Sequence, residues 1–229
     1  MTRFLPALLA LLALALPAGA LAQGAARPAQ RDWTQVVSAT PEGGFRMGNP
    51  AASIRVVEFL SLTCPHCAEF SRNATPSLMN YVRNGRVSLE YRNFVLNGLD
   101  LAASFLSRCA APQNYFALTH AILGSQQQWI GRMQALSEAQ QQAMRGQTPI
   151  ETMRRVVAAA GLDALAARHG VTAAQQSACL SSQAGLDRVL QMQQAATRYG
   201  VTGTPTFAIN GQIVAVNNWA GIEPLLRGR

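Results

Sequence analysis

Four consecutive residues, Cys64-Pro65-His66-Cys67, place two cysteines at the spacing at which a small disulfide can close and open again. They follow the apolar run 54–60, which predicts a buried strand, and a proline suits the first turn of a helix because its missing N–H would be unpaired there. Cys64 would then lie at a helix N-terminus, where free backbone N–H groups stabilise a thiolate over a thiol. The motif therefore predicts dithiol redox chemistry.

The direction of this chemistry depends on how strongly the reduced thiolate is stabilised. Cysteine pKa values at such positions fall from about 8.5 to roughly 3.5–7.5, and each unit corresponds to about 1.4 kcal/mol. A stabilised thiolate makes the disulfide form easier to reduce, and hence an oxidant of other thiols. An imidazole at His66 acts in the same direction, because it can donate a hydrogen bond to the Cys64 sulfur and adds positive charge when protonated.

Two other interpretations of the motif are a permanent structural disulfide and half of a zinc site. The chain has no second Cys-x-x-Cys to complete a zinc site, so neither a metal nor another cofactor is expected. His120 and His169, the remaining histidines, are interpreted as ordinary packing or surface residues.

The N-terminus indicates the compartment. Residues 1–22 have the pattern of a cleaved signal peptide: Arg3 is followed by the apolar segment 8–16 and by the small-x-small site Ala20-Leu21-Ala22. The alternative is an uncleaved membrane anchor, but the apolar segment is shorter than the roughly 20 residues of a membrane span. The sequence thus predicts an exported periplasmic protein, in a compartment where disulfides persist.

Composition narrows the range of partners. The 229 residues carry 19 basic and 11 acidic side chains, a net charge of +8, and every basic residue is arginine. The arginines do not cluster with interleaved aromatic residues, so binding to nucleic acid is not expected.

The elements that position the motif can be read along the chain. A helix from Pro65 to about Asn84 leads to a second strand at 87–95, which a crossover would place parallel to the first. Asn210-Gly211 is a strong hairpin-turn signal. The other expected elements are a short first element at 32–37, a strand beginning at 45–47, strands at 206–209 and 212–216, and a closing helix at 220–227.

Residues 100–199 differ from the rest because they are rich in Ala, Gln, Leu and Met and show no strand pattern, which predicts an inserted block of helices. This block contains the other two cysteines, Cys109 and Cys179. An even cysteine count in an exported chain favours a structural disulfide, and closing a loop of this length contributes about 4 kcal/mol. Two separate buried thiols, or a relay that exchanges with the Cys64–Cys67 pair, are the alternatives.

Three parts of the chain resemble the DsbA-type thiol:disulfide oxidoreductases of the bacterial periplasm. They are the Cys-Pro-His-Cys motif, the preceding strand Val57-Glu58-Phe59-Leu60, and the segment 200–207, Gly-Val-Thr-Gly-Thr-Pro-Thr-Phe. The resemblance implies an α/β thioredoxin fold with an inserted helical domain. The layout would be a signal peptide (1–22), a flexible lead (23–44), a thioredoxin-like domain (45–99 and 200–229) and a helical insertion domain (100–199).

The resemblance also implies roles for individual residues. Cys64 would be the exposed nucleophile and Cys67 the buried resolving cysteine, while Pro205 would follow a cis peptide bond facing the pair. Thr204 would offer its backbone N–H and C=O to an extended substrate segment. Glu58 matches a buried acidic position that assists proton transfer to the inner cysteine; its alternative role is that of a core carboxylate without catalytic function.

The resulting prediction is a monomeric thiol oxidase that acts on unfolded exported proteins with free cysteines and is reoxidised by a DsbB-like membrane quinone reductase. A monomer is expected because residues 23–45 are too short for the dimerisation module of dimeric isomerases. One alternative is an isomerase or reductase kept reduced by a DsbD-like partner, since threonine before the proline recurs in isomerase branches. A non-enzymatic chaperone for unfolded exported chains is the other.

Overall fold

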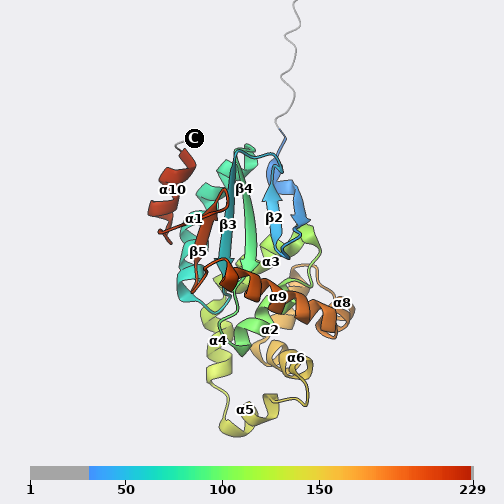
Figure 1. The fold of residues 1–229 in the computed structure, drawn as a ribbon. Coiled ribbons are helices and arrows are strands. Elements are labelled where there is room, and N and C mark those ends of the chain that lie inside the picture. Colours follow the sequence, from blue (N-terminus) through green and yellow to red (C-terminus); the bar gives the residue numbers. More distant parts are fainter. Residues whose placement is uncertain (1–30, 228–229) are drawn as a thin grey trace, which may run out of the picture. The chain divides into compact units, whose positions relative to one another are not determined.

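The computed structural model describes residues 31–227, and within them a single six-stranded sheet carries helices on its faces and beyond one end (Figure 1). The sheet order is β1-β2-β4-β3-β5-β6, and only β3 and β4 run parallel among these strands. The strands are β1 (Val37–Ala39), β2 (Phe45–Gly48), β3 (Ile54–Leu60), β4 (Val87–Asn93), β5 (Thr206–Ile209) and β6 (Gln212–Val214). This is the α/β arrangement expected of a thioredoxin fold.

The helices include the ten α-helices of the described chain and one short 3₁₀ turn, η1 (Trp33–Gln35). They are α1 (Pro65–Arg83), α2 (Gly98–Ser107), α3 (Pro112–Gly124), α4 (Gln126–Gln134), α5 (Glu138–Met144), α6 (Pro149–Ala160), α7 (Leu162–Arg168), α8 (Ala173–Leu180), α9 (Gln183–Arg198) and α10 (Trp219–Arg227). Helices α2–α9 form the expected insertion, and Figure 1 shows most of them gathered beyond the carboxyl ends of β3 and β4. No helix in residues 31–227 combines the length and apolarity of a membrane span.

Local sequence signals explain the boundaries near the site. The apolar run 54–60 forms the central strand β3, which is covered on both faces, and Pro65 occupies the first turn of α1. Gly85 adopts a φ of +82° directly after the helix, a conformation that suits glycine. Asn210 and Gly211 both have positive φ, as a type I′ hairpin requires, and join β5 to β6.

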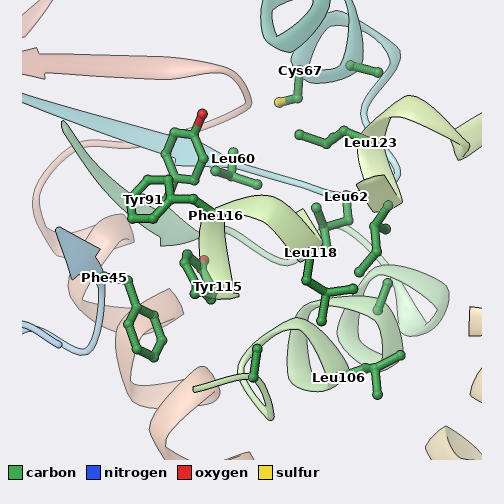
Figure 2. Close-up of a cluster of buried hydrophobic side chains, with 14 of the residues drawn as sticks. Phe45, Leu60, Leu62, Cys67, Tyr91, Leu106, Tyr115, Phe116, Leu118 and Leu123 are labelled. Atoms are coloured by element: carbon green, nitrogen blue, oxygen red, sulfur yellow. The ribbon is translucent and has the colours of Figure 1, made fainter. Parts of the chain in front are cut away.

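Two apolar clusters lie on opposite faces of the sheet. The larger one packs alternate β3 residues, including Val56 and Leu60, against α1 and the insertion, and Figure 2 shows Leu60, Cys67 and Tyr91 within it. The smaller one packs Phe59 of β3 against Ala196 of α9. Because strand side chains alternate between faces, Glu58 shares the face of the larger cluster. The active-site helix and the insertion are therefore joined through one core.

The structure corrects three segments expected from the sequence, namely the lead 23–44 and the strands 87–95 and 212–216. We expected the segment 23–44 to be a flexible lead, but η1 and β1 lie within it. β1 is ordered because it pairs with β2 at the sheet edge. Residues 23–30 lie outside the described part of the chain. The expected strands at 87–95 and 212–216 end two residues early, at Asn93 and Val214. The proposed signal peptide, 1–22, also lies outside the described residues.

Candidate active site

Cys64 is the N-cap residue of α1, in the loop that leaves the carboxyl end of β3. Its side chain is only 6% exposed, which corrects the expectation of an exposed nucleophile. The reason is its orientation: the Cys64 thiol turns inward and donates a hydrogen bond to the Thr204 carbonyl oxygen, 3.3 Å away. The nucleophile therefore lies beneath the loop that carries the proline.

Several donors converge on the Cys64 sulfur and lower its pKa from 9.0 to about 5. The largest contribution is the hydrogen bond from the Cys67 thiol, and burial opposes it. The Thr204 side chain also lowers this pKa, and its buried hydroxyl has no hydrogen-bond partner among residues 31–227. The backbone N–H groups of Cys67 and His66, at the start of α1, complete the set.

Cys67 has the opposite tendency. It is fully buried, and burial is the main reason why its pKa lies well above the usual thiol value. The hydrogen bond that the Cys67 thiol donates to Cys64 raises this pKa further, and so do the negative charges of Glu58 and Cys64. In the reduced protein Cys64 is therefore the thiolate and Cys67 keeps the proton.

Glu58 lies beneath the cysteine pair on the same face of the sheet as Val56 and Leu60. It is 2% exposed, and burial, followed by the charge of Cys64, raises its pKa from 4.5 to about 8. Its strand neighbours in register are Tyr91 of β4 and Phe207 of β5. A carboxyl group that holds its proton near neutral pH can both donate and accept a proton there.

The His66 ring does not donate the expected hydrogen bond to the Cys64 sulfur. At the second position of α1 the side chain points outward, 75% exposed, and Nδ1 lies 3.7 Å from a carboxylate oxygen of Glu69, one turn along the helix. The hydrogen bond that His66 supplies to the Cys64 sulfur comes from its backbone N–H, which corrects the predicted imidazole donor. The ring instead lines a cavity of about 260 Å³ together with Asn73, Asn217 and Trp219.

The Thr204–Pro205 peptide bond is cis, which confirms the prediction for this proline. Pro205 is buried beside the cysteine pair, directly before β5. The Thr204 carbonyl, expected to receive a substrate segment, accepts a hydrogen bond from the Cys64 thiol when that thiol is protonated.

Cys109 and Cys179 form the disulfide that the sequence favours. It joins the segment after α2 to α8, with a Cα–Cα distance of 5.6 Å and a sequence separation of 70 positions. The alternative of two separate buried thiols is therefore wrong. Among the described residues, no group of three or more His, Cys, Asp or Glu side chains has the arrangement of a metal site.

The sequence analysis missed several polar residues of the insertion that support the site. The Asp100 carboxylate and the Gln126 amide both hydrogen-bond to the active-site loop, and both side chains are buried. His120 packs against Phe116 and hydrogen-bonds to the Tyr91 hydroxyl at 2.9 Å, and burial lowers its pKa to about 4. Gln126 stands first in a run of three glutamines, so nothing in the sequence distinguishes it.

Comparison with known proteins agrees with this geometry. The sequence profile of the family described as Thioredoxin matches residues 40–227. The chain belongs to the thioredoxin family. Among solved structures of this family, a protein-disulfide isomerase from Novosphingobium aromaticivorans is 33% identical, with a TM-score of 0.74 over 81% of this chain and 96% of that one.

Two further relatives agree in fold or over part of the sequence. The fold of this thioredoxin-family chain is that of the DsbA type: Wolbachia pipientis alpha-DsbA1 aligns with a TM-score of 0.59 over 80% of this chain and 88% of that one, at 23% identity. A Rickettsia bellii protein named as a protein-disulfide oxidoreductase is 38% identical over 87 residues. That match covers 38% of this chain and 34% of the relative, so the chain matches about a third of the length of its curated relatives.

Proposed function

We propose that this thioredoxin-family protein is a periplasmic thiol oxidase that introduces disulfides into exported proteins. The observation that carries the proposal is the division between the two cysteines: Cys64 has a pKa of about 5, whereas burial keeps the pKa of Cys67 high. Stabilising the reduced state as a thiolate favours transfer of the disulfide to another protein. The signal-like segment 1–22 and a structural disulfide in the insertion support the compartment.

The reaction begins with the oxidised pair. A substrate thiolate attacks the Cys64 sulfur, the Cys64–Cys67 bond breaks, and Cys67 leaves with the bonding electrons and takes up a proton. The second substrate thiolate then attacks the substrate sulfur of the mixed disulfide, and Cys64 leaves as the stabilised thiolate. The substrate loses two electrons and the enzyme gains them.

Glu58 is the proposed source of the Cys67 proton. It is buried on the same face of the sheet, and at neutral pH it retains the proton because its pKa is about 8. In the reverse reaction, when the reduced enzyme is reoxidised, the carboxylate would accept the proton as Cys67 attacks. Buried carboxyl groups with raised pKa values are suited to both steps.

The substrates in this proposal are unfolded exported chains with free cysteines. An extended segment would bind by its backbone to Thr204, as in strand addition, while its cysteine approaches Cys64. A DsbB-like membrane quinone reductase would then reoxidise the pair, and the enzyme would act as a monomer.

A second candidate function is isomerisation or reduction, with a DsbD-like partner that keeps the pair reduced. Two observations favour it: the solved relative at 33% identity is named a protein-disulfide isomerase, and threonine precedes the cis proline. The two functions use the same residues and differ in the reduction potential of the Cys64–Cys67 pair.

The deciding experiment is the equilibrium of the Cys64–Cys67 pair with glutathione. We expect a potential well above about −200 mV, as for strong oxidants of this fold. A value near the −270 mV or so of thioredoxin would reject the oxidase proposal and leave the reductive role. A variant with both Cys109 and Cys179 replaced by serine, measured in parallel, assigns the equilibrium to the motif cysteines.

A further inference from the structure

The active-site loop between β3 and α1 is bound by polar side chains of the helical insertion. Gln126, the first residue of α4, donates from Nε2 to the Leu62 carbonyl oxygen at 2.9 Å and to the Cys64 carbonyl oxygen at 3.0 Å. Asp100 of α2 accepts the Leu62 N–H at 2.8 Å, so the backbone of Leu62 is bound on both sides. One glutamine amide therefore connects the insertion directly to the nucleophile.

These contacts are buried, so water does not replace them easily. Gln126 is 7% exposed, and Asp100 and Leu62 are fully buried. A buried carbonyl that loses its donor is left unpaired unless the chain moves to find another partner. Loss of the Gln126 amide would leave the Leu62 carbonyl unpaired and the Cys64 carbonyl with the N–H of Ala68 alone, and the second of these residues is the nucleophile.

The position of the Cys64 sulfur depends on this loop. The Cys64 carbonyl also accepts the Ala68 N–H at 3.2 Å, which is the first backbone hydrogen bond of α1. Gln126 therefore helps to fix the residue that starts the helix, and with it the direction of the side chain toward Thr204. A loop that relaxes would carry the sulfur away from the N–H groups that stabilise its anion.

We propose that Gln126 is a positioning residue for Cys64, through which the helical insertion holds the nucleophile in the geometry that favours its thiolate. The proposal rests on the redox role assigned above to the Cys64–Cys67 pair. The Gln126 amide nitrogen faces the carbonyl oxygens of Leu62 and Cys64, so it fixes the backbone on both sides of Thr63. The groups that lower the pKa of Cys64, namely Cys67, Thr204 and the backbone N–H of His66, form no hydrogen bond with Gln126 in the described chain.

The insertion contains a matched control. Gln176 of α8 is also 7% exposed, and its Nε2 also donates to two backbone carbonyls, those of Asp163 at 3.0 Å and Val171 at 2.8 Å. These contacts join α7 to α8 and do not include the active-site loop. Gln176 thus provides the same kind of buried double hydrogen bond without a connection to Cys64.

The experiment compares Gln126→Met with Gln176→Met in the full chain with the Cys109–Cys179 bridge intact. Methionine keeps the length of the side chain and removes the donors. We expect both variants to lose thermal stability, and only Gln126→Met to raise the pKa of Cys64, by about one unit, in an ultraviolet thiolate titration. At pH 7 the equilibrium constant for transfer of the disulfide to glutathione should then fall roughly tenfold for Gln126→Met alone.

Two results would overturn the proposal: a Cys64 titration in Gln126→Met that matches the wild type, or an equal shift in Gln176→Met, which would indicate general loosening. A reducing potential in the wild type would reject the oxidase function, yet the difference between the two variants would still decide the role of Gln126. If Gln126→Met does not fold, Gln126→Asn, with the amide one methylene closer to the backbone, carries the same prediction.

Discussion

The two cysteine pairs of this chain have the same chemistry and opposite roles. Cys64 and Cys67 are three positions apart at the start of α1 and are free thiols, whereas Cys109 and Cys179 are 70 positions apart and bonded. The first pair is surrounded by groups that stabilise a thiolate, and closing its disulfide restrains very little chain. The second pair closes a long loop between two segments of the insertion.

The difference shows that surroundings decide whether a disulfide is exchanged or kept. A disulfide is easily reduced where the reduced state is stabilised, and here the hydrogen bonds to Cys64 stabilise its thiolate and make it a good leaving group from a mixed disulfide. It is persistent where its reduction releases much chain entropy, as for Cys109–Cys179. The predictions below alter one pair at a time, so that reactivity and stability can be separated.

Replacing the nucleophile should have the largest effect. We expect Cys64→Ser to reduce catalysed disulfide exchange to the uncatalysed background, because a serine hydroxyl is neither a thiolate nor a leaving group in this reaction. The assay is oxidation of a reduced, unfolded substrate protein in a glutathione buffer. Residual catalysis in Cys64→Ser that disappears in a Cys109→Ala, Cys179→Ala background would show that the bridge exchanges, and would remove the distinction between the pairs.

The acidity of Cys64 should give the next largest effect. With a folded-state pKa of about 5 against an ordinary 9.0, the thiolate fraction at pH 7 is roughly a hundred times that of an unperturbed thiol. Alkylation of the reduced protein by iodoacetamide should therefore be independent of pH above about 6 and fall below it, with a midpoint near pH 5. A midpoint above pH 8 would contradict the assigned hydrogen bonds.

Because this pKa is lowered on folding, its contribution to the stability of the reduced form has a defined sign. The contribution is complete above the unfolded value of 9.0 and is lost as the pH falls through about 5. Denaturant unfolding of reduced wild type and of Cys64→Ser at several pH values tests this: the advantage of the wild type should grow from pH 5 to pH 9.

Removing the bridge should change stability and leave the chemistry in place. We expect Cys109→Ala with Cys179→Ala to lower the free energy of unfolding by about 4 kcal/mol, as estimated for closing a loop of this length. The pKa of Cys64 should not change, because neither residue contacts the active-site loop among the described contacts. Urea unfolding and the alkylation profile measure the two quantities separately. A large shift of the alkylation midpoint would indicate that the bridge acts on the active site.

The comparison also shows what the sequence could predict. The Cys-x-x-Cys spacing, the apolar strand before it and Pro65 after Cys64 are local signals, so they predict a redox pair at a strand-to-helix junction, as observed. The insertion was predictable as helical because its composition excludes strands. Pairing of Cys109 with Cys179 followed from an even count, and the structure contains it.

The remaining features depend on contacts between distant segments. The Cys64 thiol is buried because it turns toward Thr204, 140 positions away, and no local pattern gives that direction. The support from Asp100 and Gln126 requires the insertion to fold back onto the loop. β1 was missed because a three-residue edge strand is defined by its partner, β2, more than by its own sequence.

Substitution of Glu58 tests whether the buried carboxyl group beside the Cys64–Cys67 pair lowers the stability of the fold. Its pKa of about 8 lies above the unfolded value of 4.5, so the fold loses stability as the pH rises from about 4.5 to 8. We expect Glu58→Gln to raise the free energy of unfolding of the reduced protein by roughly 1–3 kcal/mol at pH 7, and less at pH 5. The same variant should reduce more slowly with a small thiol, because Cys67 loses its proton source. Unchanged reduction kinetics together with increased stability would assign Glu58 to the core alone.

His66 should give the smallest effect, and its salt dependence distinguishes the ring from the backbone. The imidazole is 75% exposed and lies beside Glu69, so it faces solvent, whereas the backbone N–H of His66 is retained in any substitution. We expect His66→Ala to raise the pKa of Cys64 by less than one unit at low salt, and the difference from the wild type to shrink at about 1 M salt, where the Debye length falls to about 3 Å. The measurement is the thiolate titration at both salt concentrations. A shift that persists at high salt would mean that the ring rotates inward to bind the thiolate, and the active pair would then depend on a side-chain donor in addition to the backbone of α1.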